Sequence, residues 1–511
     1  MHARSVFISL LLALTLALCG NAFAGGTVGF TVKWYNTPTL LSADDGLPVR
    51  TGIVMADLNR DGIPDVAYTY PGGVIVKLGT GGGNLGPDNS YTASESDLGE
   101  LETADINGDG YLDLMVREVG NDEIFLLLNN GDGTFHLVGG LVTDGIPGSF
   151  TLGDFNHDGK IDAAVIDCDS PVAPFPVGAA SCKLDIYLGD NQSFALKQTI
   201  QLADASYNLQ SADINGDGNL DLIFVRDSVG VILWGRENGT FSGSSYLKPP
   251  TTLPMDAVAV GDFNNDARLD VALLSGNPCR PTPDDSGCDG PNPNTVWMYK
   301  NNGGANFTLT SHAPFAAQAG SIVPADINGD LNQDLIYYNP FAEGMSPVLS
   351  GLGQSGKFLA YALGQGKDNL GSQGTLPDNS YDVAVAFRDM NGDSRADYAV
   401  IDWNEQLLGI SIQTGGWKNC APPNSAKLAA KICGISNGAT VTSPLLVKAS
   451  GNSPAGVNQL QVWIDGKKQY VKWGDQLSKK FTLSAGSHRI SVVANDKYVG
   501  HASTVINVSV H

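Results

Sequence analysis

Short apolar runs alternate with polar turns along most of the chain, and the same order of runs recurs seven times. In one copy, residues 112–116 form a β-rich run, residues 124–128 form a second run, and a Gly/Asn turn follows. A more polar strand then leads into the next copy. Four short strands whose hydrophobicity falls in this order are typical of one antiparallel blade. The pattern therefore predicts an all-β protein built from repeated four-stranded units.

A nine-residue phrase, Asp-x-Asn-x-Asp followed by three further residues and a final Asp, begins after the first apolar segment of each copy. It is clearest at residues 105–113, where Gly110 stands at the sixth position. The repeat period lies between 48 and 64 residues, because the seven copies start at Asp57, Asp105, Asp154, Asp213, Asp262, Asp326 and Asp389. A period near 50 residues indicates one supersecondary unit per repeat.

The phrase places side-chain oxygens at its first, third, fifth and ninth positions. Calcium takes six to eight oxygen ligands at roughly 2.3 to 2.6 Å, and such a loop can wrap the ion, with a backbone carbonyl at the seventh position. We therefore expect Ca²⁺ as the cofactor. The expected ligands are Asp57, Asn59, Asp61, Asp65, Asp105, Asn107, Asp109, Asp113, Asp154, Asn156, Asp158, Asp162, Asp213, Asn215, Asp217, Asp221, Asp262, Asn264, Asp266, Asp270, Asp326, Asn328, Asp330, Asp334, Asp389, Asn391, Asp393 and Asp397.

The sixth position of the phrase separates the seven copies into two groups. The first four copies carry glycine, which allows the sharp turn with positive φ. The last three carry Ala267, Leu331 and Ser394, for which positive φ is strained, so we expect those loops to bind calcium weakly or not at all. The alternative is that Asp and Asn only cap turns through hydrogen bonds. Capping does not require three carboxylates in every loop, and uncompensated carboxylates would repel one another.

The two ends of the repeated region suggest how it closes. The last unit, at residues 381–416, lacks a fourth strand, whereas residues 30–35 form a strand-like piece ahead of the first unit. We predict that residues 30–35 supply the outer strand of the seventh unit.

The repeated phrase, its period and the turn Asn-Asn-Gly-Asp-Gly-Thr-Phe at residues 129–135 resemble the FG-GAP or VCBS repeats of secreted proteins, which are related to the integrin α-subunit propeller. The resemblance covers about residues 27–416. It implies a seven-bladed β-propeller over residues 25–416, with calcium in the loops between the first and second strands of each blade.

The sequence changes in character after residue 416. Residues 417–435 form a linker that contains Pro422, Pro423 and a cysteine pair. Residues 436–511 show about seven short strands with period-two alternation, and Asp465-Gly466 is a hairpin signal. This region resembles the Ig-like modules of bacterial surface proteins. We expect an immunoglobulin-like β-sandwich without the Cys-Trp-Cys core of antibody domains.

The N-terminus has the pattern of an export signal. Arg4 precedes an apolar stretch at residues 6–18, and residues 22–24 form an A-x-A cleavage site. We expect a signal peptide at residues 1–24 and a soluble mature protein outside the cell, at its surface or in the periplasm. A rival interpretation makes Cys19 a lipid-attachment site, although Leu18 before it is bulky for such a site. No other run reaches the roughly 18 apolar residues of a membrane span.

Six cysteines remain after the signal, and an even number in an exported chain favours disulfides. The expected pairs are Cys168 with Cys182, Cys279 with Cys288, and Cys420 with Cys433. The alternative of free thiols or a metal site is less favoured, because there is no C-x-x-C pair and no nearby His.

The formal net charge of -23 comes largely from the repeated phrase. Its three Asp in each of seven copies account for nearly the whole imbalance, and bound divalent ions would cancel much of it. The chain has no Lys/Arg cluster of the kind that nucleic acid or an anionic membrane needs. We therefore expect neither as a partner.

Candidate catalytic groups do not form a recognisable motif. The seven His are scattered, and His157 lies at a phrase position that normally faces solvent. We expect a monomeric protein- or glycan-binding module whose aromatic face lies opposite the metal loops. The expected face contains Tyr70, Phe175, Tyr337, Tyr338, Phe341 and Trp403. The alternatives are a polysaccharide lyase or hydrolase on the same scaffold, and a passive envelope protein.

Overall fold

The structure is a computed structural model, and no helix occurs among the residues it describes. These are residues 30–38, 52–94, 96–119, 121–168, 182–202, 206–276, 294–315, 320–328, 332–338, 359–367, 369–376, 382–391, 396–402, 406–413, 420, 427–453, 456–496 and 500–510. The expected all-β class is confirmed. The signal peptide, Cys19 and the Cys279/Cys288 pair lie outside the described residues.

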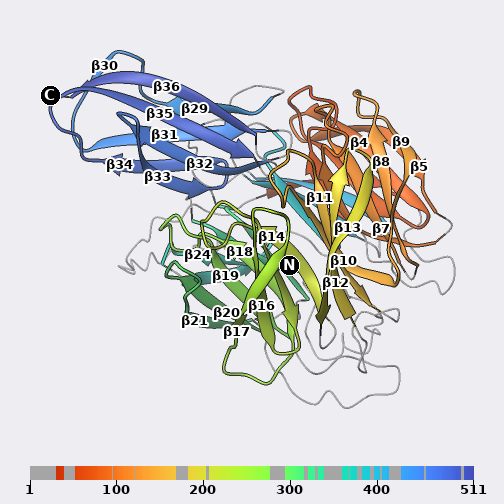
Figure 1. Cartoon of the computed structure of the whole chain (residues 1–511). Helices are drawn as coiled ribbons and strands as arrows, with labels where there is room; N and C mark the ends of the chain where they lie inside the picture. The colour runs from red at the N-terminus through yellow and green to blue at the C-terminus, as the bar shows by residue number, and fades with distance from the viewer. Residues whose placement is uncertain are drawn as a thin grey trace, which may run out of the picture.

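Seven four-stranded antiparallel sheets follow one another along the described part of the chain (Figure 1). The first two contain β2 (Ile53–Ala56), β3 (Asp65–Tyr70), β4 (Gly73–Gly81) and β5 (Asn84–Thr92), then β6 (Leu98–Ala104), β7 (Asp113–Glu118), β8 (Glu123–Asn129) and β9 (Phe135–Val142). The third and fourth contain β10 (Ile146–Gly153), β11 (Asp162–Cys168), β12 (Cys182–Asp190) and β13 (Ser193–Leu202), then β14 (Ser206–Ala212), β15 (Asp221–Arg226), β16 (Val229–Gly235) and β17 (Phe241–Leu247).

The remaining three sheets keep the same order of strands. The fifth contains β18 (Met255–Gly261), β19 (Asp270–Ser275), β20 (Asn294–Asn301) and β21 (Phe307–Phe315), and the sixth contains β22 (Ser321–Ala325), β23 (Asp334–Tyr338), β24 (Leu359–Gly364) and β25 (Leu370–Thr375). The seventh contains β26 (Asp382–Arg388), β27 (Asp397–Asp402), β28 (Leu407–Gln413) and, as its fourth strand, β1 (Phe30–Asn36).

Strand β1 completes the last sheet from the beginning of the chain. It pairs antiparallel with β28, and Phe30 lies opposite Gln413 while Tyr35 lies opposite Leu408. The prediction that residues 30–35 form the outer strand of the seventh unit is confirmed. The sheet that ends the repeated region is therefore held to the chain segment that begins it.

Apolar side chains fill the space between successive sheets. Each pair of neighbouring sheets shares one buried cluster, as where Val76 of the first sheet and Leu114 of the second pack together. A cluster of the same kind joins the first sheet to the last through Tyr68, Ile401 and Ile410. Burial of this apolar surface, at about 25 cal/mol per Å², is the main force that holds the sheets together. The sheets thus pack in sequence order and close on themselves.

Polar side chains on the first strands bridge neighbouring sheets. The Glu100 carboxylate on β6 accepts a hydrogen bond from the Phe150 backbone N–H on β10, at 3.0 Å. In the same way, Gln210 on β14 donates to the Val258 carbonyl on β18, at 2.7 Å. These bonds satisfy backbone groups of strands that have no partner strand on that side.

The C-terminal strands form a separate pair of sheets, drawn in blue in Figure 1. One sheet has the order β29-β31-β34 and the other has the order β30-β36-β35-β32-β33. The strands are β29 (Ala429–Cys433), β30 (Ala439–Val441), β31 (Leu445–Asn452), β32 (Val457–Ile464), β33 (Lys467–Trp473), β34 (Gln476–Phe481), β35 (Gly486–Asp496) and β36 (His501–Val510). Val447 of the first sheet and Val462 and Ile490 of the second belong to one buried core.

Two of the three expected disulfides are present. Cys168 is bonded to Cys182 at the adjoining ends of β11 and β12, and Cys420 is bonded to Cys433, the last residue of β29. Within the described residues, no helix is long and apolar enough to cross a membrane.

Candidate functional site

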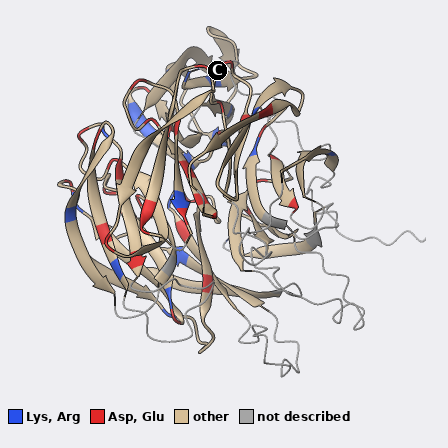
Figure 2. Ribbon diagram, turned by 90° about the vertical axis from the view of Figure 1, so that its right-hand side faces the viewer, with Lys and Arg blue, Asp and Glu red and all other residues tan. Residues whose placement is uncertain are grey.

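The nine-residue phrase forms the loop between the first and second strands of each sheet. Its last Asp is the first residue of the second strand in all seven sheets, and it is fully buried there. Acidic positions therefore recur from sheet to sheet, as Figure 2 shows in red. The described part of each loop lies where the sequence predicts it.

The ninth Asp ties its loop to the end of the third strand. One oxygen of Asp65 accepts a hydrogen bond from the Leu58 backbone N–H at 2.7 Å, and the other accepts one from the Gly79 N–H at 2.7 Å. The same two-sided arrangement recurs at Asp113, Asp162, Asp221, Asp334 and Asp397. The sequence suggested only a metal ligand at this position, and the contacts show that it is also a structural link.

The buried position also alters the acidity of this carboxyl group. Burial raises the pKa of Asp65, Asp113 and Asp221 to about 7 and that of Asp162 to about 6, although the backbone N–H donors lower it. Positive charge nearby would favour the ionised form. A carboxylate oxygen has two lone pairs, so it can accept an N–H and still contact a cation.

The first, third and fifth residues fold the loop around a set of oxygens. In the first loop, Asp57 Oδ2 accepts from the Gly62 N–H at 3.0 Å, and Asn59 Oδ1 accepts from the Asp61 N–H at 3.0 Å. The other oxygen of Asp57, and its counterpart in Asp105, are buried without a hydrogen-bond partner. A buried acceptor of this kind is costly unless a cation or donor satisfies it. The all-oxygen donor set and these two oxygens fit a calcium ion.

The sixth position has the same backbone conformation in every loop where it is described. Gly62, Gly110, Gly159 and Gly218 have φ between 82° and 96°, and Ala267 of the fifth loop has φ of 72°. This left-handed backbone conformation costs about 1–2 kcal/mol of free energy for alanine, whereas glycine adopts it without that cost. Asp330 and Leu331 of the sixth loop, and Asp393 and Ser394 of the seventh, lie outside the described residues.

The turns between second and third strands lie at the end of the sheets away from the phrase loops. There they meet the links between sheets, as where the Val119 N–H donates to the Asp97 carbonyl at 2.8 Å. Tyr70 and Tyr338 lie at this end, are partly buried and pack against the clusters between sheets. Phe175, Phe341 and Trp403 lie outside the described residues.

The assignment of Tyr337 to an exposed aromatic face is wrong. Its side chain is only 2% exposed and belongs to the cluster between the fifth and sixth sheets. Strand alternation explains this, because Tyr337 and Tyr338 are consecutive and must point to opposite faces of β23. Burial raises the pKa of the Tyr337 hydroxyl.

An exposed aromatic residue that the sequence did not single out lies at this end of the fourth sheet. Tyr246 on β17 is 47% exposed and pairs with Val231, near the β15–β16 turn. The Arg226 guanidinium and the Lys248 ammonium each lie 5.7 Å from the centre of its ring. A hydrogen bond from Ser244 and these two charges hold the pKa of Tyr246 below its usual value. The sequence feature that could have indicated Tyr246 is a single Tyr in a strand rich in Ser and Gly.

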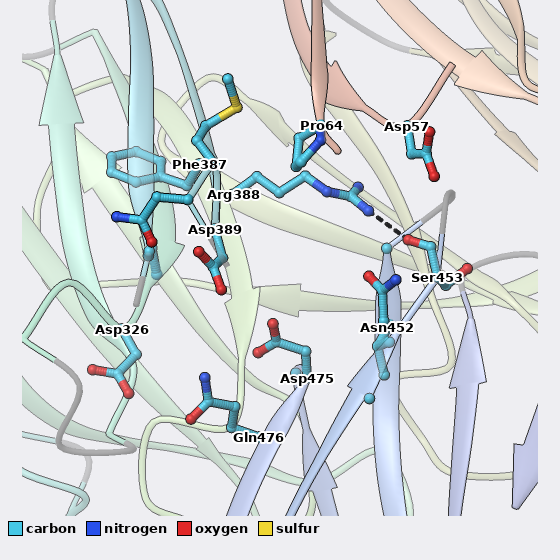
Figure 3. A pocket seen from close by; sticks show the side chains of 18 of the residues that line it. Asp57, Pro64, Asp326, Phe387, Arg388, Asp389, Asn452, Ser453, Asp475 and Gln476 are labelled. Carbon is cyan, nitrogen blue, oxygen red and sulfur yellow. Dashed lines mark hydrogen bonds between the residues drawn. The ribbon is translucent and has the colours of Figure 1, made fainter. Parts of the chain in front are cut away.

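The C-terminal domain lies against the phrase-loop end of the sheets. The Arg388 guanidinium on β26 donates to the Ser453 carbonyl at the end of β31 and to the Met55 carbonyl on β2 (Figure 3). A cavity of about 630 Å³ lies between the two parts of the chain. Asp326, Asp389 and Asp475 point into this space in Figure 3. The carboxylates around Arg388 oppose the effect of burial, which lowers the pKa of its guanidinium.

A separate acidic group lies beside the Cys168–Cys182 disulfide. Asp144, Asp167 and Asp185 can place one oxygen each within 4.8 Å of one another, which is close enough to hold a metal ion. Lys183 is already among them, with its Nζ 3.5 Å from Asp167 and 3.1 Å from Asp185. The lysine therefore supplies positive charge to this cluster.

Comparison with known proteins supports the repeat. Residues 57–116, 105–165 and 213–273 match the model of the FG-GAP-like repeat, so the FG-GAP character is confirmed for these segments. No curated protein sequence matches the chain.

Solved structures of similar arrangement include BBS1N in complex with ARL6DN, with 12% identity, a TM-score of 0.44, and coverage of 75% of this chain and 97% of that chain. Another is an Agrocybe aegerita lectin, described as specifically recognising non-reducing terminal N-acetylglucosamine. It has 15% identity, a TM-score of 0.33, and coverage of 86% of this chain and 87% of that chain. We draw no functional conclusion from likenesses at this level.

Proposed function

We propose that the chain is an exported, calcium-binding recognition module. In this proposal residues 25–416 form a seven-bladed β-propeller and residues 436–511 an Ig-like sandwich. Residues 417–435 form a linker whose strand β29 pairs with β31 and so joins the sandwich. The seven sheets, the clusters shared by neighbours and the pairing of β1 with β28 support the propeller. The two C-terminal sheets around one core support the sandwich. A removed signal at residues 1–24 and two disulfides are consistent with export.

Calcium has a structural role in this proposal. Two features support its binding in the first four repeats. Asp57 and Asp105 each have a buried oxygen without a hydrogen-bond partner, and the loops offer only oxygen ligands. Ions bound there would stabilise one end of the propeller without taking part in chemistry.

Recognition of a partner takes place at the other end. The observation that carries this part is Tyr246, which is exposed between two cationic side chains at the end not contacted by the C-terminal domain. A tyrosine with an apolar ring and a polar hydroxyl suits contact with a glycan or a protein. Arg226 and Lys248 favour a ligand that carries carboxylate or sulfate groups.

Binding of the full mature chain to an array of neutral and acidic glycans tests this function. We expect acidic glycans to bind, and we expect Tyr246→Ala and Arg226→Ala to weaken binding at least tenfold. Leu196→Ala, on the exposed outer strand β13, is the matched control and leaves binding unchanged. If Tyr246→Ala and Arg226→Ala bind as well as the wild type, the proposed face is wrong.

A further inference from the structure

Among the phrase loops that the structure describes, the fifth, Asp262–Asp270, is set apart by ion pairs at its fifth residue. Its fifth residue, Asp266, has a carboxylate oxygen 3.1 Å from Lys300 Nζ and 3.3 Å from Arg268 Nη1. In the fourth loop, the corresponding Asp217 accepts hydrogen bonds from Asn215 and Asn219, and it has no ion pair among the described residues. The seven-sheet part of the chain therefore supplies two cations, Lys300 and Arg268, to the fifth loop.

A third cation reaches the same loop from the C-terminal domain. Lys472 on β33 is only 5% exposed, and its ammonium donates a hydrogen bond to Asn265 Oδ1. Burial raises the pKa of Asp262, and the charge of Lys472 is the leading opposing influence. Tyr470, on the same strand, has its pKa raised to about 12 by burial and then by the charges of Asp262 and Asp266. Strand β33 therefore lies directly on this loop.

The charges of this loop balance without a metal ion. Asp266 pairs with both Lys300 and Arg268, and the charge of Lys472 acts on Asp262, so three cations accompany the three carboxylates of the loop. A divalent ion placed among them would be repelled by the buried ammonium of Lys472, where screening by solvent is weak. Ala267 at the glycine position is a second departure, since it strains the turn that the metal-binding loops make with glycine.

We propose that the fifth loop is neutralised by the side chains of Lys472, Lys300 and Arg268 in place of calcium, and that Lys472 thereby latches the C-terminal domain onto the ring. The inference rests on the proposed function in one respect, because it contrasts the fifth loop with loops that are proposed to bind calcium. Asn265, which accepts the hydrogen bond from Lys472, is itself bonded to the sixth loop. Its Nδ2 donates to Asn332 Oδ1 at 2.7 Å. Arg388, which donates to the Ser453 carbonyl, provides a second contact across the cavity of Figure 3.

Small-angle X-ray scattering of the full mature chain tests the latch. We expect wild type and Lys467→Met to be equally compact in calcium and in EGTA, since Lys467 is an exposed lysine of the same strand. Lys472→Met should increase the radius of gyration and the maximum dimension in both solutions. Circular dichroism confirms that each variant is folded. Unchanged dimensions for Lys472→Met, or release of the wild-type domain by EGTA, would overturn the latch.

Calcium counting tests the other half of the proposal. Asp262→Asn combined with Asp266→Asn should leave the number of calcium ions bound per chain unchanged, whereas Asp105→Asn combined with Asp109→Asn should lower it by one. Loss of one ion in the fifth-loop variant would contradict the proposal. If the wild type binds no calcium, the calcium part of the proposed function is wrong. The scattering experiment still tests whether Lys472 holds the C-terminal domain in place.

Discussion

The Asn129 side chain joins two successive sheets by donating from Nδ2 to the Leu58 carbonyl at 2.7 Å and to the Leu112 carbonyl at 3.0 Å. Leu58 and Leu112 belong to the phrase loops of the first and second sheets. Asn301 makes the same pair of bonds between the fourth and fifth sheets, at 2.7 and 3.0 Å. Buried amides at the ends of third strands therefore connect neighbouring loops around the ring.

Removal of the Asn129 amide should destabilise the protein. Asn129→Ala leaves two buried carbonyl groups without their donor, which costs about 1–3 kcal/mol of unfolding free energy. Asn130→Ala is the matched control, because Asn130 is exposed and bonds only to groups of its own turn and strand. Denaturant unfolding monitored by tryptophan fluorescence measures both. Equal midpoints for the two variants would show that the amide link is unimportant.

The ninth and fifth residues of a loop should respond differently to the same change. Asp113→Asn turns an amide group toward backbone N–H donors and should lower the unfolding free energy by about 1–3 kcal/mol in both calcium and EGTA. Asp109→Asn, at an exposed position of the same loop, should reduce stability only in calcium. Thermal unfolding in the two solutions separates these roles. A loss confined to calcium for Asp113→Asn would mean that its only role is that of a metal ligand.

Glu100 should make stability fall as the pH rises. Burial raises the pKa of Glu100 to about 7, and the charge of Glu102 adds to this rise. The Arg117 guanidinium and the hydrogen bonds from Ser149 and the Phe150 N–H partly oppose it. The folded state then holds its proton above the pKa of the unfolded chain, which is near 4.5. Stability from this group is present below pH 4.5 and is lost as the pH rises to about 7.

Urea unfolding of wild type and Glu100→Gln at several pH values measures this effect. Glu100→Gln should gain stability relative to wild type between pH 5 and pH 8, whatever the offset caused by the lost partner of Arg117. Glu237→Gln is a suitable control, since Glu237 is exposed in the turn between β16 and β17. A constant difference across that range would contradict the shift.

Much of the fold follows from local regularity in the sequence. Apolar alternation and the repeated phrase predict the strands and loops, because both depend on neighbouring residues. The pairing of β1 with β28 could be predicted because the last unit lacks a strand and the first is preceded by one.

Contacts between distant segments could not be predicted in the same way. Nothing local shows that Lys472 reaches Asn265, 207 residues away, or that Tyr337 is covered by the preceding sheet. The two-sided bonds of Asp65 also depend on Gly79, whose distance from the loop is fixed only by strand register. Tyr246 lies in a strand that gives no local sign of its charged neighbours.

The number of calcium ions bound per chain, measured by equilibrium dialysis and elemental analysis of the mature protein, shows whether the phrase loops are metal sites. We expect four tightly bound ions, one for each loop with glycine at its sixth position. Asp109→Asn and Asp217→Asn should each remove one ion, and saturation at 100 times Kd should stabilise the fold by about 2.7 kcal/mol per site. Absence of bound calcium, or a count that neither substitution changes, would contradict this expectation.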